Sequence, residues 1–310
     1  MSSQTDSPPD RTVPQTSELQ RRLTKFRETL SIVFDNDMAK VGAVMLTLFV
    51  LMAVFAPVIT PNVPDERVTT DDGSWVKEAG PSAEYPLGTT TQAYPIFSQL
   101  VYGTRIAFIA GLLTALMVGG IGTLAGIVSG YYGGVTESAI MRLVDITYGI
   151  PFLPFAIVLI IVVGGGSIFN IVFAISLLLW RGTARVIRSE VISIKEQPMI
   201  TAAKASGASN KRIMLYHILP KVLPTSVLYS VFAIGWAIIA EAGLSFIGLG
   251  DPDMLSWGKM LNTAYVGNAI QLDMWNWIIP PGLFITLFVI SAYFVSQGIE
   301  EVVNPQLREP

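Results

Sequence analysis

Residues that could do chemistry are few in this sequence, and their scarcity excludes several kinds of site. The chain has no cysteine and a single histidine, His217. Disulfides, thiolate metal sites, cysteine nucleophiles and histidine clusters are therefore excluded. No GxxxxGK[ST] phosphate-binding loop occurs, so the chain has no recognisable means of binding ATP. We expect no catalytic residue, no metal site and no cofactor bound by the chain itself.

Three charged residues lie within or beside long apolar stretches, where a charge needs a partner. Arg142 precedes Asp145 by three positions, a spacing that places both side chains on one face of a helix. Because charge is costly in an apolar medium, we expect the two to pair, either as a structural ion pair or as a contact that moves. Glu241 is expected near the end of a helix, where it is either solvated or lines a path for a substrate.

The elements that must position these residues are apolar helices. Of the 310 residues, 51% are hydrophobic and 14% are charged, against about 25% charged in an ordinary soluble domain. The charges are bunched, and most runs between them have the ~20 residues that a membrane-spanning helix needs. The run 146 to 180 is too long for one helix, and Gly164 to Ser167 predicts a hairpin within it. We predict an all-α integral membrane protein with six transmembrane helices, at about 38 to 58, 106 to 129, 139 to 163, 168 to 187, 222 to 246 and 276 to 298.

The positive charges predict how these helices cross the membrane. If both termini are cytoplasmic, sixteen of the twenty lysines and arginines lie inside, and only Arg67, Lys77, Arg105 and Lys259 lie outside. We therefore predict cytoplasmic termini. The predicted N-terminal tail covers residues 1 to 37 and contains an amphipathic helix from Ser17 to Phe34. A first transmembrane helix over 38 to 60 and an extracytoplasmic loop over 61 to 105 follow. The permease-like core covers 106 to 300, with a cytoplasmic loop over 188 to 221, and a C-terminal tail covers 301 to 310.

Glycines and prolines inside the predicted helices indicate how the helices pack and bend. Gly122, Gly126 and Gly130 recur every fourth residue, which lets two helices approach closely and favours packing, with helix sliding as the alternative. Prolines remove backbone donors and kink helices, which either shapes a cavity or forms a hinge. Such prolines occur at positions Pro151, Pro154, Pro280 and Pro281.

The cytoplasmic loop has the pattern of two short helices around a turn. Pro198 suits a first helical turn, Gly207 suits a helix end, Ser209 suits an N-cap, and Pro220 is predicted to end the second helix. The first helix is expected to expose small side chains. They either form a knob that docks into another protein or belong to a compact loop of helix-forming residues, and they are Ala202, Ala203, Ala205 and Ala208.

The segment "TAAKASGASNKRIMLYHILP" resembles the cytoplasmic signature of ABC importer permeases, which has Glu-Ala-Ala, three residues, Gly and, further on, Leu-Pro. The matching residues are Ala202, Ala203, Gly207, Leu219 and Pro220, and Thr201 stands where the family has glutamate. Four further stretches share the resemblance: "YPLGTTTQAYPIFSQLVYGTRIAF" (85–108), "GYYGGVTESAIMRLVDITYGIP" (130–151), "EAGLSFIGLG" (241–250) and "NPQLRE" (304–309). The stretch over 85–108 departs most from the family pattern. It has Tyr85, Thr90 and residues 93 to 95 at positions where the family usually has other, polar residues.

The resemblance covers residues 35 to 308 and narrows to the C-type permease of dipeptide, oligopeptide and nickel importers. It implies the type I ABC importer permease fold in a prokaryotic inner membrane. It also implies that residues at the signature positions couple the permease to a separate ATPase, namely Thr201, Ala202, Ala203, Gly207, Leu219 and Pro220.

The resemblance further implies partners and a transported substrate. The partners are a related second permease, two ATPase subunits or domains that bind ATP and Mg²⁺, and an extracytoplasmic solute-binding protein. Di- or oligopeptides are the expected substrates, with nickel as the alternative, and this subunit is not expected to be an enzyme. A self-sufficient channel or secondary transporter is the rival class, and the net charge of −3 gives no reason to expect a nucleic acid.

Overall fold

The apolar runs form long helices in the computed structural model, which describes residue 31 and residues 33–304. Among these described residues, five helices are long and apolar enough to cross a membrane, and a bent pair gives a sixth crossing if it counts as one span. The predicted all-α membrane architecture is confirmed. Residues 33–304 contain no β-strand, only isolated bridges that join Thr69 to Trp75 and Thr89 to Pro95. Residues 17–30 of the predicted amphipathic helix, and residues 305–310 of the C-terminal tail, lie outside the described residues.

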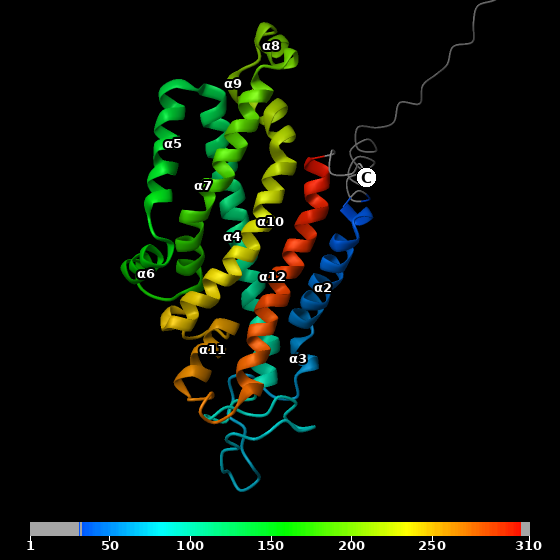
Figure 1. Cartoon of the computed structure of the whole chain (residues 1–310), viewed down its shortest axis with the longest axis vertical. Helices are drawn as coiled ribbons and strands as arrows, with labels where there is room; N and C mark the ends of the chain where they lie inside the picture. Colours follow the sequence, from blue (N-terminus) through cyan, green and yellow to red (C-terminus); the bar gives the residue numbers. More distant parts are fainter. Residues whose placement is uncertain (1–30, 32, 305–310) are drawn as a thin grey trace, which may run out of the picture.

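The helices alternate in direction along the long axis of the molecule (Figure 1). The start of α2, the end of α12 and the short helices α8 and α9 lie at one end, whereas α11 and the loop before α4 lie at the other. The bounds are α2 Asp37–Val54, α3 Ala56–Ile59, α4 Ile96–Tyr132, α5 Gly134–Gly149, α6 Phe152–Val163, α7 Ile168–Lys195, α8 Pro198–Ala205, α9 Asn210–Ile213, the π-helical η1 Met214–Ile218, α10 Leu219–Leu244, the π-helical η2 Ser245–Leu249, α11 Trp257–Val266 and α12 Trp275–Val303.

The three glycines spaced by four place α4 directly against α7. A Cβ on Gly122 would lie 2.6 Å from the Cβ of Thr183, and one on Gly126 would lie 2.7 Å from the Cβ of Ile187. A Cβ on Gly130 would lie 2.8 Å from the Cβ of Val191. Real side chains do not approach so closely, so this seam requires glycine. The packing interpretation of the glycine stripe is confirmed.

Helix α4 begins ten residues earlier than predicted, at Ile96 instead of residue 106. The prediction used Arg105 as a boundary, but the helix accommodates this charge. The central carbon of the Arg105 guanidinium group lies 4.8 Å from the centre of the Tyr102 ring. The Arg105 Nε donates a hydrogen bond of 2.8 Å to the carbonyl oxygen of Ala53. The loop between α3 and α4, which we predicted to be extracytoplasmic, is correspondingly shorter. Within it, hydrogen bonds from Thr70 and Ser74 hold the pKa of the Asp72 carboxyl below its ordinary value.

The single helix predicted over 139 to 163 is wrong, because it is two helices bent by 101°. Ile150 and Pro151 both have extended backbone and separate α5 from α6. A residue before proline is disfavoured in the helical conformation, so the predicted kink at Pro151 is a full break. Pro154 lies in the first turn of α6, where a missing N–H costs no intrahelical bond. The hairpin after α6 is confirmed, with φ of +111° at Gly164 and +103° at Gly165.

The prediction that Pro220 ends a helix is also wrong. The chain remains helical from Asn210 through Leu249, with η1 immediately before Pro220. In η1 the N–H of Leu219 bonds to the carbonyl oxygen of Met214, five residues back. This wider turn lets the helix accept a residue without an N–H, and Pro220 sits in the first turn of α10. The fifth span is thus joined directly to the loop that carries α8 and α9. Pro280 and Pro281 lie inside α12.

Candidate functional site

The segment from Pro198 to Ile213 has the local structure that its residues predict. Pro198 occupies the first turn of α8, and Gly207 follows the helix with φ of +77°, a conformation that favours glycine. The Ser209 hydroxyl accepts a hydrogen bond of 3.4 Å from the backbone N–H of Arg212 and caps α9. The two helices and the turn therefore form a defined knob at one end of the molecule (Figure 1).

The knob has an inner and an outer face. Ile200, Ile213 and Ile218 are fully buried, together with residues of α4, α7 and α10. Ala203 and Ala208 pack partly against this cluster, so the prediction that they are exposed is wrong for these two. Ala203 lies three residues after Ile200 and shares its inward face. The exposed residues of the segment are Pro198, Met199, Thr201, Ala202, Lys204, Ala205, Ser206, Gly207, Ser209, Asn210, Lys211 and Arg212.

Polar contacts attach the knob to the spans. The hydroxyl of Tyr131, at the end of α4, donates a hydrogen bond of 2.8 Å to the side-chain oxygen of Asn210. The ammonium group of Lys204 lies 5.5 Å from the centre of the Tyr131 ring. Leu219 is partly buried in the same apolar cluster, whereas Pro220 is exposed. A force on the knob can therefore reach α4, α7 and α10 together.

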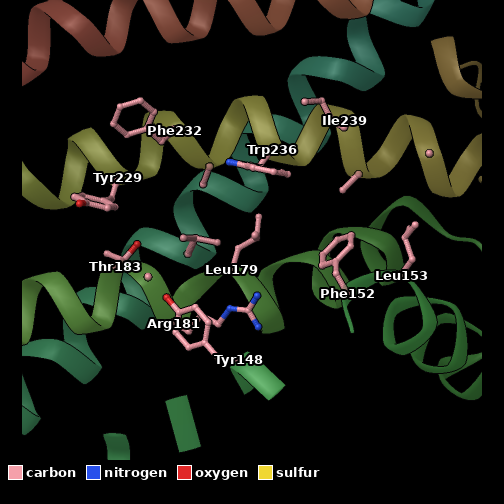
Figure 2. A pocket seen from close by; sticks show the side chains of 15 residues that line it. Tyr148, Phe152, Leu153, Leu179, Arg181, Thr183, Tyr229, Phe232, Trp236 and Ile239 are labelled. Carbon is pink, nitrogen blue, oxygen red and sulfur yellow. The ribbon is translucent and has the colours of Figure 1, made fainter. Parts of the chain in front are cut away.

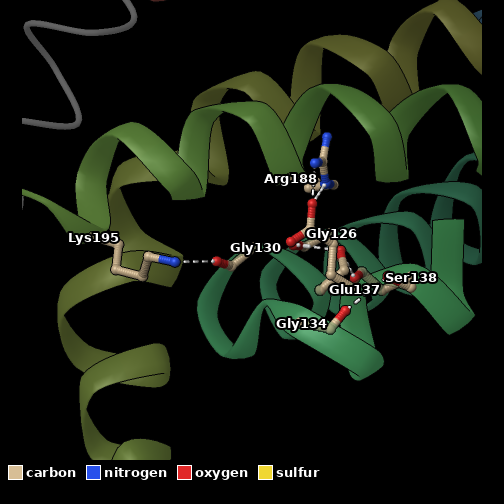
Figure 3. Close-up of polar contacts among 9 residues, drawn as sticks. Gly126, Gly130, Gly134, Glu137, Ser138, Arg188 and Lys195 are labelled. Carbon is tan, nitrogen blue, oxygen red and sulfur yellow. Dashed lines mark hydrogen bonds and ion pairs between the residues drawn. The ribbon is translucent and has the colours of Figure 1, made fainter.

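A second set of contacts fixes α5 at the same end of the molecule, as Figure 3 shows. Arg188 of α7 donates to the Glu137 carboxylate of α5 through Nε, at 2.8 Å, and through Nη2. Lys195 donates a bond of 3.2 Å to the carbonyl oxygen of Gly130, where α4 ends. Both Glu137 and Arg188 are partly buried. The sequence interpretation did not single out this pair, because its members are 51 residues apart.

Asp145 forms an ion pair, but with Arg185 of α7 and not with Arg142. The Asp145 Oδ1 and Arg185 Nη2 atoms are 2.6 Å apart. The pairing with Arg142 predicted from spacing is wrong because α5 turns Asp145 towards α7. The side chain of Asp145 is 66% exposed, so this contact lies on a surface of the chain and not in its core.

Glu241 is buried, with 5% of its surface exposed, so the interpretation as a solvated carboxylate is wrong. The hydroxyl of Ser245 donates a hydrogen bond of 2.6 Å to its Oε1, and Ser256 provides a further hydrogen bond. Ser256 also caps α11, so Glu241 lies where α10, η2 and α11 meet. A role of Glu241 in a pathway stays a prediction.

A cavity of about 910 Å³ lies between α10 on one side and α5, α6 and α7 on the other, and Val118 of α4 also lines it. Figure 2 shows its lining, which we call the groove. Aromatic and aliphatic side chains dominate this lining, and its charged residue is Arg181. The fifteen lining residues are Val118, Tyr148, Phe152, Leu153, Leu179, Arg181, Gly182, Thr183, Tyr229, Phe232, Ala233, Trp236, Ile239, Ala240 and Gly243.

The sequence interpretation missed the groove, although one signal for it was present. Tyr229, Phe232 and Trp236 recur at a spacing of three and four residues, which places them on one helix face. Trp236 is 65% exposed within this chain, whereas Tyr229 and Phe232 are partly buried, so the described chain covers this face only in part. Arg142, Asp145 and Glu241 are not among the lining residues.

Spanning helices around an apolar groove, with a structured knob at one end, define a multi-pass membrane permease. The chain belongs to the family of binding-protein-dependent transport system inner membrane components, whose model matches residues 122–309. A second model, for the N-terminal transmembrane domain of oligopeptide transport permease C, matches residues 24–81. The resemblance to C-type ABC importer permeases is thereby confirmed, and the chain is an inner-membrane permease subunit of an ABC importer.

Individual relatives cover almost the whole chain. The dipeptide transport system permease protein DppC of Alkalihalophilus pseudofirmus is 32% identical over 97% of this chain and 96% of its own length. The oligopeptide transport system permease protein OppC of Bacillus subtilis is 30% identical over 93% of this chain and 92% of its own. The glutathione transport system permease protein GsiD of Escherichia coli is 32% identical over 88% of both chains.

Proposed function

We propose that this chain forms half of the translocation pathway of an ATP-driven importer of di- or oligopeptides. The substrate class rests on the similarity, over 88 to 97% of the chain, to permeases named for dipeptides, oligopeptides and glutathione. Glutathione is itself a small peptide, so the three names share one substrate chemistry. The groove supports this assignment, because its volume of about 910 Å³ falls in the range of small-molecule sites.

The other half of the pathway is a related second permease that closes the groove. The exposed aromatic face of α10, which includes Trp236, is an apolar surface beside a cavity. Such a surface suits another set of helices. An extracytoplasmic solute-binding protein delivers the peptide to the assembled pair of permeases.

Coupling to the ATPase takes place at the knob. The exposed Thr201, Ala202 and Gly207 form the docking surface for one of two ATPase subunits or domains, which carry ATP and Mg²⁺. Their small size permits close approach of a partner. Ala203 and Leu219 face the apolar cluster that the knob shares with the spans, and Pro220 begins α10. Closure of the ATPases moves the knob, and the attached helices then change access to the groove.

Uptake into proteoliposomes tests the substrate class. The complex of this chain with its second permease, its ATPases and its binding protein is supplied with labelled dialanine. We expect ATP-dependent uptake that trialanine or glutathione reduces by competition and that Ni²⁺ leaves unchanged. Uptake of Ni²⁺ in place of peptide would establish the alternative of a nickel importer. No uptake of any peptide would contradict the proposed substrate.

A further inference from the structure

Arg181 is the charged residue in a groove whose other lining residues are uncharged. It lies on α7 and is partly buried. Its Nη1 donates a hydrogen bond to the carbonyl oxygen of Thr147, close to the end of α5. The guanidinium group has five N–H donors, so this bond leaves most of them available to a ligand.

The aromatic ring of Tyr148 fixes the position of this guanidinium group. The central carbon of the Arg181 guanidinium lies 4.4 Å from the ring centre, and that of Arg185 lies 4.5 Å from the same centre. Figure 2 shows Arg181 and Tyr148 together at the wall of the groove. Stacking holds a guanidinium group in one orientation and leaves its edge free for hydrogen bonds.

The neighbouring arginines of α7 have carboxylate partners, but Arg181 has none in the part of the chain that the structure describes. Arg185 pairs with Asp145, and Arg188 pairs with Glu137. Arg181 therefore presents an uncompensated positive charge to an apolar cavity. Because ionic interactions strengthen where water is excluded, this site favours an anion with paired oxygens.

We propose that Arg181 binds the carboxylate of a peptide substrate as the peptide passes through the groove. The inference rests on the proposed function, since a free C-terminal carboxylate is the anion that every unmodified peptide carries. A carboxylate crossing an apolar groove loses water, and the guanidinium group replaces those hydrogen bonds. Arg181 is thus a residue that selects for peptides with a free carboxylate.

The test compares trialanine with its C-terminal amide in the complete importer, at saturating amounts of loaded binding protein. For Arg181→Gln we expect the maximal uptake rate of trialanine to fall about tenfold, since charge-assisted hydrogen bonds contribute ~1.5–3 kcal/mol. Uptake of the amide should change less than twofold. For each peptide, the uptake rate of the variant is divided by that of the wild type. Any preference of the binding protein cancels in this ratio, because both importers use the same binding protein.

Two further variants separate binding from structure. Arg181→Lys keeps the charge and should retain trialanine uptake within about threefold of wild type. Arg185→Gln removes the neighbouring cation, which stacks on the same tyrosine but does not line the groove, and should affect both peptides by the same factor.

Three results would overturn the role of Arg181. An equal loss for both peptides in Arg181→Gln would indicate a structural role or pairing with a carboxylate of the second permease. An unchanged trialanine rate in Arg181→Gln would show that the charge is not used. If Arg181→Lys lost as much trialanine uptake as Arg181→Gln, the positive charge at position 181 would not account for carboxylate binding. A wild-type importer that takes up neither peptide would instead contradict the proposed substrate class.

Discussion

At the residue scale, the exposed alanines of α8 bear most directly on coupling. Ile200 and Ala203 turn inward to the apolar cluster, whereas Ala202 and Ala205 face outward. The two faces follow from the helical period, which brings residues three or four apart to the same side. One face therefore holds the knob to the spans, and the other is exposed at the place where we propose that the ATPase docks.

A large side chain at Ala202 should block docking while the permease still folds. For Ala202→Arg we expect ATP-driven uptake to fall at least tenfold and the ATPase to be lost on co-purification, because bulk and charge prevent close approach. Ala202→Ser adds one small hydroxyl and is the matched control, with uptake near that of wild type. Full coupling in the arginine variant would place the docking surface elsewhere.

Glu241 contributes to stability through its hydrogen bonds with serine hydroxyls. Glu241→Leu removes the acceptor for Ser245 and Ser256 and should lower the free energy of unfolding by about 1–3 kcal/mol. Glu241→Gln keeps an acceptor of similar volume and should lose less than about 1 kcal/mol. Thermal unfolding in detergent measures both. If the glutamine variant is stable but transports a changed set of peptides, Glu241 takes part in the pathway.

At the element scale, the seam between α4 and α7 is a close helix contact that depends on three glycines. Gly126→Ala places a Cβ 2.7 Å from the Cβ of Ile187 and 2.8 Å from the carbonyl oxygen of Ala184. Because the helices must separate to relieve this overlap, we expect a loss of about 1–3 kcal/mol in thermal unfolding.

Gly120→Ala is the matched control in the same helix. A Cβ at Gly120 meets no atom within 4 Å, and alanine favours the helix by about 1 kcal/mol over glycine. We therefore expect this variant to be at least as stable as wild type. Equal destabilisation by the two substitutions would indicate that glycine matters for flexibility and not for packing.

The existence of these elements could be predicted because apolar runs and their breakers are local properties of a sequence. The boundaries of these helices could not be predicted, because they depend on contacts made in the folded chain. Contacts with α2 and α4 accommodate Arg105 within a helix, and a π-helical turn accommodates Pro220. The partner of Asp145 and the burial of Glu241 depend on how helices distant in sequence pack together. The groove needs five helices at once, so spacing within α10 indicated only one of its walls.

At the scale of the whole molecule, the two ends differ in what they present. One end carries α8, α9 and the described ends of α2 and α12, and the other carries α11 and the loop before α4 (Figure 1). The charge bias of the sequence leads us to propose that the end with α8 is cytoplasmic. This orientation is required if the knob is to meet an ATPase.

The absence of cysteine from the sequence makes this orientation simple to test. Ser206→Cys directly after α8 and Ala83→Cys in the loop before α4 each introduce one exposed thiol at opposite ends. In intact cells that express the chain, a membrane-impermeant maleimide should label the variant at position 83 at once. It should label the variant at position 206 only after permeabilisation. The reverse pattern would contradict cytoplasmic termini.

We propose that this chain is one half of a translocation pathway and depends on ATPase subunits for energy. Proteoliposomes containing only this chain should therefore show no accumulation of labelled dialanine. Those containing the complete complex should accumulate it when ATP is present on the side of the ATPases. Accumulation by the chain alone, driven by an ion gradient or by the peptide gradient itself, would contradict the account and identify a self-sufficient transporter or channel.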